Sequence, residues 1–265
     1  MAIGLKRMTT EFSAFIGVEA NRERAYPFTY AAIDRDLTIR AIGRGNIKDA
    51  FAFLAGQESA LAAINSPMTT SKGLLKREEI RQKLSSKSRL GRWANLRLVE
   101  YELLERGVHV PRTPGTLKSS PRWMKLGFHL FEELDKLGFQ RYPGEDSSKQ
   151  YFECQGEAAF WNLLGHAPLK EHTLEGRLQR QLVLQLCGLP VPDAMLFFEE
   201  ITRHHLLNST LPLDNLYYNE ELNALAAAFT AWLACNKADK VICIGNEEEG
   251  FIYLPDQSVQ EQSSH

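Results

Sequence analysis

Two apolar runs near the start of the chain are separated by a predicted hairpin and a predicted helix, and this order constrains the fold strongly. The first run, residues 14–18, stops at Glu19. Residues 28–33 and 37–42 flank a short Asp-rich turn, which predicts an antiparallel hairpin. Asn46 then caps a helix that returns the chain to the second run, residues 61–64. Because a helical crossover separates them, the two apolar runs should pair in parallel.

Helical and strand patterns alternate along the rest of the chain, which predicts an α/β class with a mixed sheet of five strands flanked by helices. We expect one domain over residues 1–255, with residues 73–137 as a helical insertion laid over the sheet. The polar residues 256–265 predict a disordered tail. The other expected elements are strands at 151–154, 241–244 and 250–254 and helices at 123–137, within 156–187, from 192 and at 218–235.

The composition is that of a globular protein able to fold alone. The chain has 265 residues, of which 44% are hydrophobic and 24% charged. No apolar stretch reaches the length of a membrane span, and the N-terminus lacks the pattern of a secretory signal, so we expect a cytoplasmic protein that does not enter membranes. Its four cysteines form no CxxC pair, which indicates buried thiols. The oligomeric state stays open.

Charge is distributed unevenly along the sequence. Between Lys72 and Lys125, fourteen basic residues face five Glu, so this window carries +9 and leaves −11 for the rest of a chain whose total is −2. A basic block beside an acidic remainder suits a surface that docks a polyanion such as nucleic acid. The alternative is a pair of solvated helices whose charges only confer solubility.

Polar side chains stand where several predicted elements begin or end. Glu19 and Asn65 each follow an apolar strand, Glu153 follows a third, and Glu220 and Asn223 lie in the first turns of a late helix. Carboxylates at strand ends are typical of metal sites. Each has a plainer interpretation, because glutamate is common at a sheet rim, Asn-Ser-Pro favours a turn, and acids are favoured at helix N-termini.

An ordered set of motifs resembles the DUF429 family of predicted ribonuclease H-like nucleases. The resemblance covers most of the chain and implies a ribonuclease H-like domain. The motifs, in order, are FIGVEA, LAAINSP, RWANLRLVEYELLERGV, YFECQGEAAFWNLLG, LKEHTLEGR, NEELNALAAAFTAWLA and EGFIYLP.

The resemblance also implies where the active site would lie. Glu19 and Asn65 stand where the family has Asp, Glu153 stands at the family's Glu, and Asn223 stands at the Asp of the late helix. The implied catalytic residues are therefore Glu19, Asn65, Glu153 and Asn223, with Glu19, Glu153 and Glu220 as ligands of Mg²⁺ or Mn²⁺. Two ions about 4 Å apart would activate water and stabilise the leaving oxygen of a phosphodiester. Each Asn in place of Asp removes one negative charge from this site.

The expected function is accordingly a metal-dependent nuclease weakened by the loss of carboxylates. The alternative is a non-catalytic module that binds nucleic acid or protein on the same fold. Phosphoryl transfer to a small molecule is a third possibility, but the chain has no recognisable nucleotide-binding loop. The basic residues expected to contact a nucleic-acid backbone are Arg92, Arg97, Arg112, Lys118, Lys170 and Arg177.

Overall fold

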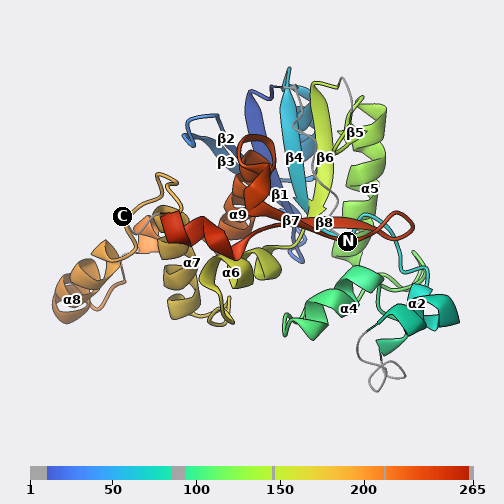
Figure 1. Cartoon of the computed structure of the whole chain (residues 1–265). Helices are drawn as coiled ribbons and strands as arrows, with labels where there is room; N and C mark the ends of the chain where they lie inside the picture. Colours follow the sequence, from blue (N-terminus) through green and yellow to red (C-terminus); the bar gives the residue numbers. More distant parts are fainter. Residues whose placement is uncertain (1–10, 85–92, 145–146, 212, 263–265) are drawn as a thin grey trace.

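The computed structural model describes residues 11–84, 93–144, 147–211 and 213–262, which form one mixed sheet with helices on both faces (Figure 1). The strand order is β3-β2-β1-β4-β6-β8-β7, and β5 pairs with β6. The strands are β1 (Ala14–Ala20), β2 (Phe28–Ile33), β3 (Ile39–Gly45), β4 (Ala60–Asn65), β5 (Gln140–Arg141), β6 (Lys149–Cys154), β7 (Val241–Asn246) and β8 (Gly250–Pro255).

Helices follow most of the strands. The α-helices are α1 (Ile47–Ala55), α2 (Glu78–Lys83), α4 (Leu98–Glu105), α5 (Arg122–Lys136), α6 (Gly156–Leu164), α7 (Leu174–Leu186), α8 (Leu196–Asn208) and α9 (Asn219–Asn236). Short 3₁₀ turns are η1 (Leu74–Lys76), η3 (Leu213–Asn215), η4 (Ala238–Lys240) and η5 (Gln257–Gln262).

Strand β1 lies between two strands that run in opposite directions to each other. It runs antiparallel to β2 and parallel to β4, and the register places Glu19 beside Asn65. Strand β6 continues the parallel part of the sheet, where Cys154 lies beside Asn65. The crossover helix α1 begins at Asn46, which forms a capping box with Asp49. The topology predicted for the first 67 residues is therefore confirmed.

Two apolar layers cover the two faces of the sheet. Because side chains alternate along a strand, Phe15 and Phe152 face the layer that contains α9, α6 and α7. Ile16 and Tyr151 face the opposite layer, which contains α1 and α5. Within each strand, successive side chains therefore meet helices of different layers. This alternation governs which polar residues can share a site.

Helix α9 lies unusually close to β1 because both elements are made of small residues at their contact. Eleven of the 18 residues of α9 are buried, and six of these are alanines. A Cβ atom on Gly17 would overlap the carbonyl oxygen of Ala224. The glycine in the apolar run before Glu19 is therefore needed for close approach of a helix, which brings the start of α9 to the end of β1.

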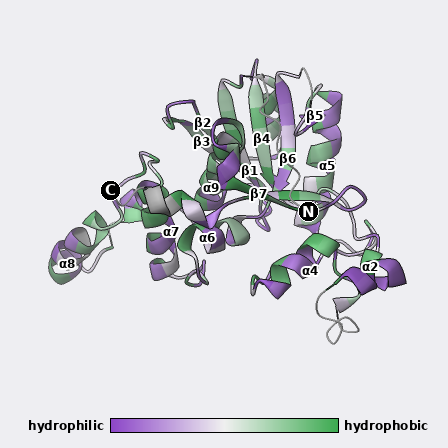
Figure 2. Cartoon of the chain, viewed as in Figure 1, coloured by the Kyte–Doolittle hydropathy of each residue, from purple (hydrophilic) through white to green (hydrophobic). Residues whose placement is uncertain are grey.

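Hydropathy follows these layers (Figure 2). Strand β4 is hydrophobic along most of its length, as expected for a strand covered on both faces. In contrast, α5 has one hydrophobic side, and its buried residues include Leu130 and Leu134. Among the described residues, no helix is both long enough and apolar enough to cross a membrane.

The structure corrects three details of the predicted architecture. The sheet has eight strands instead of five, because the hairpin of β7 and β8 joins it beside β6 and β5 also pairs with β6. Within 73–137, only the first part forms its own small cluster, around Leu75, Leu96 and Tyr101. Helix α5 instead belongs to the main core. The expected disordered tail contains η5, where Ser258 bonds to Asp256.

Candidate functional site

Glu19 and Asn65 lie side by side where β1 and β4 end. Both residues face the α9 layer, because they continue the alternation set by Phe15 and Ala63. The Asn65 side-chain amide donates a hydrogen bond to Oε2 of Glu19. Parallel neighbours thus bring the two predicted residues into direct contact at the carboxyl edge of the sheet.

The orientation of the Asn65 amide is fixed by the chain that follows β6. The backbone N–H of Gly156 donates to Oδ1 of Asn65 at 3.0 Å. Since a backbone N–H can only donate, the oxygen of Asn65 must face Gly156 and its nitrogen must face Glu19. Asn65 therefore presents N–H groups, and not an oxygen, to the site.

Asn223 completes this polar group from α9. Its side chain lies close enough to Glu19 to lower the pKa of that carboxyl group. A Cβ on Gly156 would lie 2.8 Å from Oδ1 of Asn223 and 2.9 Å from Nδ2 of Asn65. Only glycine leaves room for both amides here, so Gly156 is a site residue that the sequence motifs did not single out. We call Glu19, Asn65 and Asn223 the edge site.

The edge site holds its carboxyl group in an unfavourable place for a negative charge. Burial disfavours the charged form of Glu19 and raises its pKa well above the ordinary value. The nearby carboxylates of Glu171 and Glu220 raise this pKa further. Hydrogen bonds from Asn65 and Asn223 act in the opposite direction without cancelling the increase. A proton or another positive group beside Glu19 would relieve this repulsion.

Glu153 does not join the edge site, which corrects the expectation that it would converge there with Glu19. It pairs in register with Ile64, on the face of the sheet opposite Asn65. Its carboxylate forms a bidentate ion pair with Arg97, at 2.7 and 2.9 Å, and accepts a hydrogen bond from the N–H of Met68 at 2.8 Å. Side-chain alternation along β6 therefore sends the expected metal ligand to the other layer.

The position of Arg97 also differs from the prediction, because we expected its side chain at a surface that faces nucleic acid. Its side chain is only 1% exposed, and it also donates to the carbonyl oxygen of Glu249 at 2.7 Å. The Glu249 carboxylate in turn accepts the backbone N–H groups of Lys72 and Leu98. This buried network fastens the turn between β7 and β8 to the start of α4 and to β6. The contacts made by Arg97 and Glu153 are structural.

The other predicted nucleic-acid contacts are dispersed. Arg92 lies outside the described residues. Lys118 and Lys170 are exposed, as is Arg112, which lines a pocket of about 280 Å³ with Trp93. Arg177 donates to the carbonyl oxygens of Leu216 and Tyr217, so it fixes the chain before α9.

A group of aromatic and charged side chains lies beside the start of α9. The guanidinium of Arg44 is 4.2 Å from the centre of the Tyr218 ring, and that of Arg177 is 5.0 Å from it. Arg44 also approaches Glu221 at 3.5 Å and Glu220 at 3.9 Å. Glu220 thus lies near the edge site, but one of its neighbours is an arginine.

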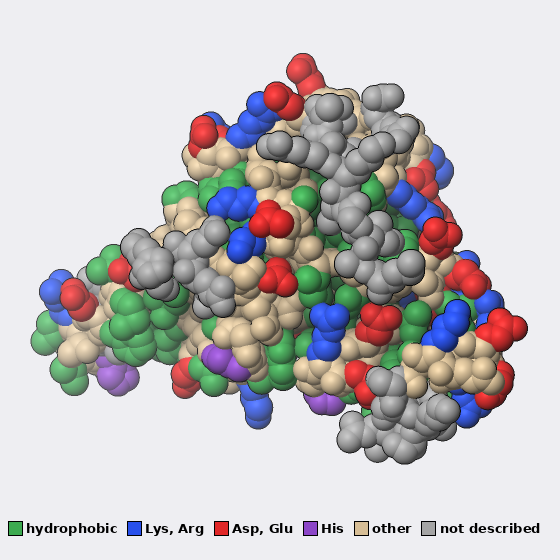
Figure 3. Space-filling view, in the orientation of Figure 1, with side chains coloured by type: hydrophobic (Ala, Val, Ile, Leu, Met, Phe, Trp, Pro, Cys, Tyr) green, Lys and Arg blue, Asp and Glu red, His purple; other side chains and the backbone are tan. Residues whose placement is uncertain are grey.

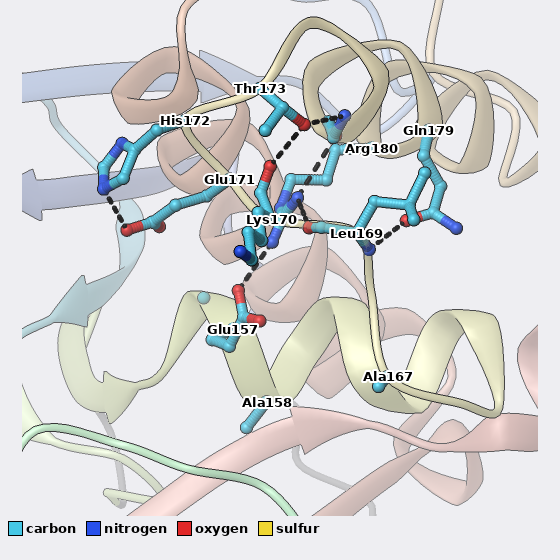
Figure 4. A network of polar contacts seen from close by, with 12 residues as sticks. Glu157, Ala158, Ala167, Leu169, Lys170, Glu171, His172, Thr173, Gln179 and Arg180 are labelled. Carbon is cyan, nitrogen blue, oxygen red and sulfur yellow. Dashed lines mark hydrogen bonds and ion pairs between the residues drawn. The ribbon is translucent and has the colours of Figure 1, made fainter.

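The loop between α6 and α7 carries Glu171 and is held by a buried arginine (Figure 4). Arg180 donates to the carbonyl oxygen of Leu169 at 2.7 Å and to Glu157 at 2.6 Å. Thr173 caps α7 and also bonds back to Lys170 at 2.9 Å. These contacts give the loop a defined path, so that Glu171 lies near Glu19. The sequence offered only the motif LKEHTLEGR as a signal for it.

The donor set of the edge site does not fit a pair of Mg²⁺ or Mn²⁺ ions. Such a pair needs several carboxylates that bridge and neutralise it. Here one carboxylate is present, the Asn65 amide donates a hydrogen bond to it, and Glu153 is bound to Arg97. Over the described parts of the chain, no group of three or more His, Cys, Asp or Glu side chains is arranged to hold a metal ion.

Comparison of the chain with family models, with curated proteins and with solved structures finds no match.

Proposed function

We propose that the chain is a ribonuclease H-like protein diverged from the DUF429 family. The order β3-β2-β1-β4-β6, with β1 to β3 antiparallel and β1, β4 and β6 parallel, supports this assignment. The contact between Glu19, Asn65 and Asn223 supports it as well, because these residues come from distant motifs that the resemblance assigns to one site. A fold does not determine a function, which depends instead on the chemistry of the site.

The function that the geometry supports best is that of a non-catalytic binding module, whose edge site binds a positively charged group of a protein partner. The observation that carries this proposal is the environment of the Glu19 carboxyl group. Its carboxyl group is half-buried beside the Asn65 amide, and the carboxylates of Glu171 and Glu220, the latter also near Arg44, raise its pKa. A lysine or arginine side chain would pair with Glu19 and reduce repulsion among the three glutamates.

A nucleic-acid backbone fits this site less well. The carboxylates of Glu171 and Glu220, which raise the pKa of Glu19, would also repel a phosphate group brought to the edge site, because like charges repel. The strongest basic candidates are engaged elsewhere, because Arg97 is buried against Glu153 and Arg177 binds backbone carbonyls. The electrostatic character of the edge site is therefore that of a receptor for cations.

The alternative is a weakened metal-dependent nuclease. One observation favours it: Glu19, Asn65 and Asn223 lie together at the carboxyl edge of the sheet. It requires divalent ions to compensate for repulsion of the phosphate, and the donor set does not fit an ion pair. We therefore keep it as an outcome of the test.

Calorimetric titration of the full chain separates the two functions. The probes are a short lysine-rich peptide, MnCl₂ alone, and a single-stranded oligonucleotide with and without MnCl₂. We expect the peptide to bind at an affinity that falls at least about tenfold in Glu19→Gln, since a charge-assisted contact is worth about 1.5 to 3 kcal/mol. Glu105→Gln, which removes an exposed carboxylate outside the edge site, is the matched control and should bind like the wild type.

Two results would contradict the binding module. One is peptide binding that is equal in the wild type, Glu19→Gln and Glu105→Gln. The other is Mn²⁺-dependent cleavage of the oligonucleotide that is lost in Glu19→Gln and kept in Glu105→Gln, which would establish the nuclease.

A further inference from the structure

A pocket of about 280 Å³ lies between α4 and the segment that follows it, and it shares no residue with the edge site. Helices α4 and α2 pack together at one end of the molecule (Figure 1). Over this end, Figure 3 shows Lys and Arg side chains interspersed with Asp and Glu, so neither sign of charge predominates on the face shown. The side chains that line the pocket therefore decide which ligand it accepts.

Glu100 brings a buried carboxyl group to the wall of this pocket, although the residue is only 3% exposed. Its Oε2 accepts the backbone N–H of Arg97 at 3.0 Å, and its Oε1 accepts that of Thr113 at 2.9 Å. These two bonds fix the orientation of the carboxyl group. Because an ionised carboxylate has about four acceptor positions, Glu100 can accept further bonds from a ligand.

The surroundings of Glu100 favour a positive group beside it. Burial raises the pKa of Glu100 above the ordinary value, because the carboxylate loses its hydration. The charge of Arg97 acts in the opposite direction without cancelling this increase, and its guanidinium is itself paired with Glu153. A cationic donor in the pocket would stabilise the Glu100 carboxylate.

Arg112 supplies a positive charge to the same pocket. It directly precedes Thr113, whose N–H binds Glu100, so the backbone brings the two charged residues to one place. Arg112 and His109, which also lines the pocket, have exposed side chains. Within the part of the chain that the structure describes, neither side chain forms a hydrogen bond or an ion pair. A guanidinium of this kind can bind a carboxylate through two parallel hydrogen bonds.

Much of the remaining wall is apolar. Leu96, Leu104 and Val110 line the pocket, and Leu104 follows Glu100 by one turn on the same face of α4. Pockets that hold drug-sized ligands typically measure about 300 to 1,000 Å³, so this pocket suits a smaller molecule. The lining thus combines an acid, a base and an apolar surface for a small ligand.

We propose that this pocket binds a free amino acid with an apolar side chain. The ammonium group of the ligand donates to Glu100, its carboxylate accepts from Arg112, and its side chain packs against Leu104 and Val110. The two charged groups of an amino acid share one carbon atom. They suit a pocket in which a hydrogen bond joins the segments that carry the two opposite charges. This binding is independent of the function of the edge site.

Ligands with a single charge fit the pocket less well. An anion without an ammonium group would pair with Arg112 but would be repelled by Glu100. A cation without a carboxylate would pair with Glu100 but would be repelled by Arg112. A zwitterion satisfies both residues at once, so charge complementarity selects it over either relative.

Calorimetric titration of the full chain with L-leucine and L-phenylalanine tests the proposal. At least one of them should bind with a Kd of about 1 mM or lower. Each amino acid is compared with the amine that lacks its carboxylate, isoamylamine or phenethylamine, and with the acid that lacks its ammonium group, isocaproate or hydrocinnamate. Each of these relatives should bind at least about tenfold more weakly, because it loses one charge-assisted contact.

Arg112→Gln should weaken binding of the amino acid at least about tenfold and leave binding of the amine no weaker than in the wild type. This change of preference cannot come from unfolding. Arg24→Gln, which removes an exposed arginine outside the pocket, is the matched control and should bind like the wild type. Glu100→Gln should weaken binding of the amino acid but not of the acid. Its melting temperature shows whether it is folded, and Arg112→Gln alone decides if it is not.

Three results would overturn the proposal. The first is the absence of binding of both amino acids at concentrations up to about 10 mM. The second is an amine or an acid that binds the wild type as tightly as its parent amino acid. The third is equal binding of the amino acid by Arg112→Gln and Arg24→Gln.

Discussion

At the scale of single residues, the chemistry of the edge site depends on which atoms face one another. The backbone N–H of Gly156 donates a hydrogen bond to the side-chain oxygen of Asn65. The side-chain nitrogen of Asn65 therefore points to Glu19. An aspartate at this position would accept the same bond from Gly156 but would present a second carboxylate to Glu19. The amide thus places an N–H group, and not a second negative charge, beside the half-buried carboxyl group of Glu19.

We predict that Glu19→Gln stabilises the protein at neutral pH. The pKa of Glu19 in the folded state lies above the ordinary value of 4.5, so the folded protein binds this proton more tightly than the unfolded chain does. The resulting stability is fully present below pH 4.5 and is lost as pH rises through the folded-state pKa. The gain from Gln should therefore be larger at pH 8 than at pH 4.

Urea unfolding of the wild type and Glu19→Gln at pH 4 and pH 8 measures this gain. The two proteins should differ little at pH 4, where Glu19 is protonated in the folded state. A difference that is the same at both pH values would mean that Glu19 does not have a raised pKa.

At the scale of elements, α9 can place Asn223 beside Glu19 only because it packs directly on β1. We predict that Gly17→Ala destabilises the protein by about 3 kcal/mol or more, since the added Cβ would overlap the backbone of Ala224 and neither element can shift freely. The melting temperature should then fall by about 6 °C or more. Gly115→Ala is the control, because its Cβ would lie 3.4 Å from the nearest atom, the oxygen of Ser71. Equal melting of the two variants would show that α9 is not this close to β1.

The elements themselves can be predicted well from the sequence, because apolar periodicity and capping residues are local signals. Asn46 marks the start of α1, and the order of hairpin and crossover fixes the pairing of β1 with β4. The size of the sheet is harder to predict, because β5 is only two residues long and carries no periodicity. The ordered η5 is equally hard to predict, because its polar sequence resembles a flexible tail.

The edge site can be predicted only in part, for reasons that are not local. Glu19 and Asn65 meet because parallel strands end at the same edge. Glu153 ends a neighbouring strand, but the sequence YFEC does not show which face of the sheet its alternate residues occupy. The pairing of Glu153 with Arg97 spans 56 positions and has no local signal. Glu171 is placed by the contacts of Arg180, which form only in the folded chain.

At the scale of the whole molecule, the described residues of the basic block do not form one surface. Part of its charge is neutralised within the protein, as Arg97 pairs with Glu153 and Arg77 pairs with Glu248. The edge site, by contrast, gathers negative charge around Glu19. In the function that we propose, the chain uses this acidic site to bind a positive group of a partner.

The most direct test of the edge site as a receptor is the titration of the Glu19 carboxyl carbon by NMR, with Glu19→Gln used to assign the signal. We predict that the pKa of Glu19 lies well above the ordinary glutamate value of 4.5 and that saturation with a lysine-rich peptide lowers this pKa markedly. A Glu19 signal that titrates with the other glutamates, or that does not respond to the peptide, would contradict the claim that the edge site is a receptor for a positive group.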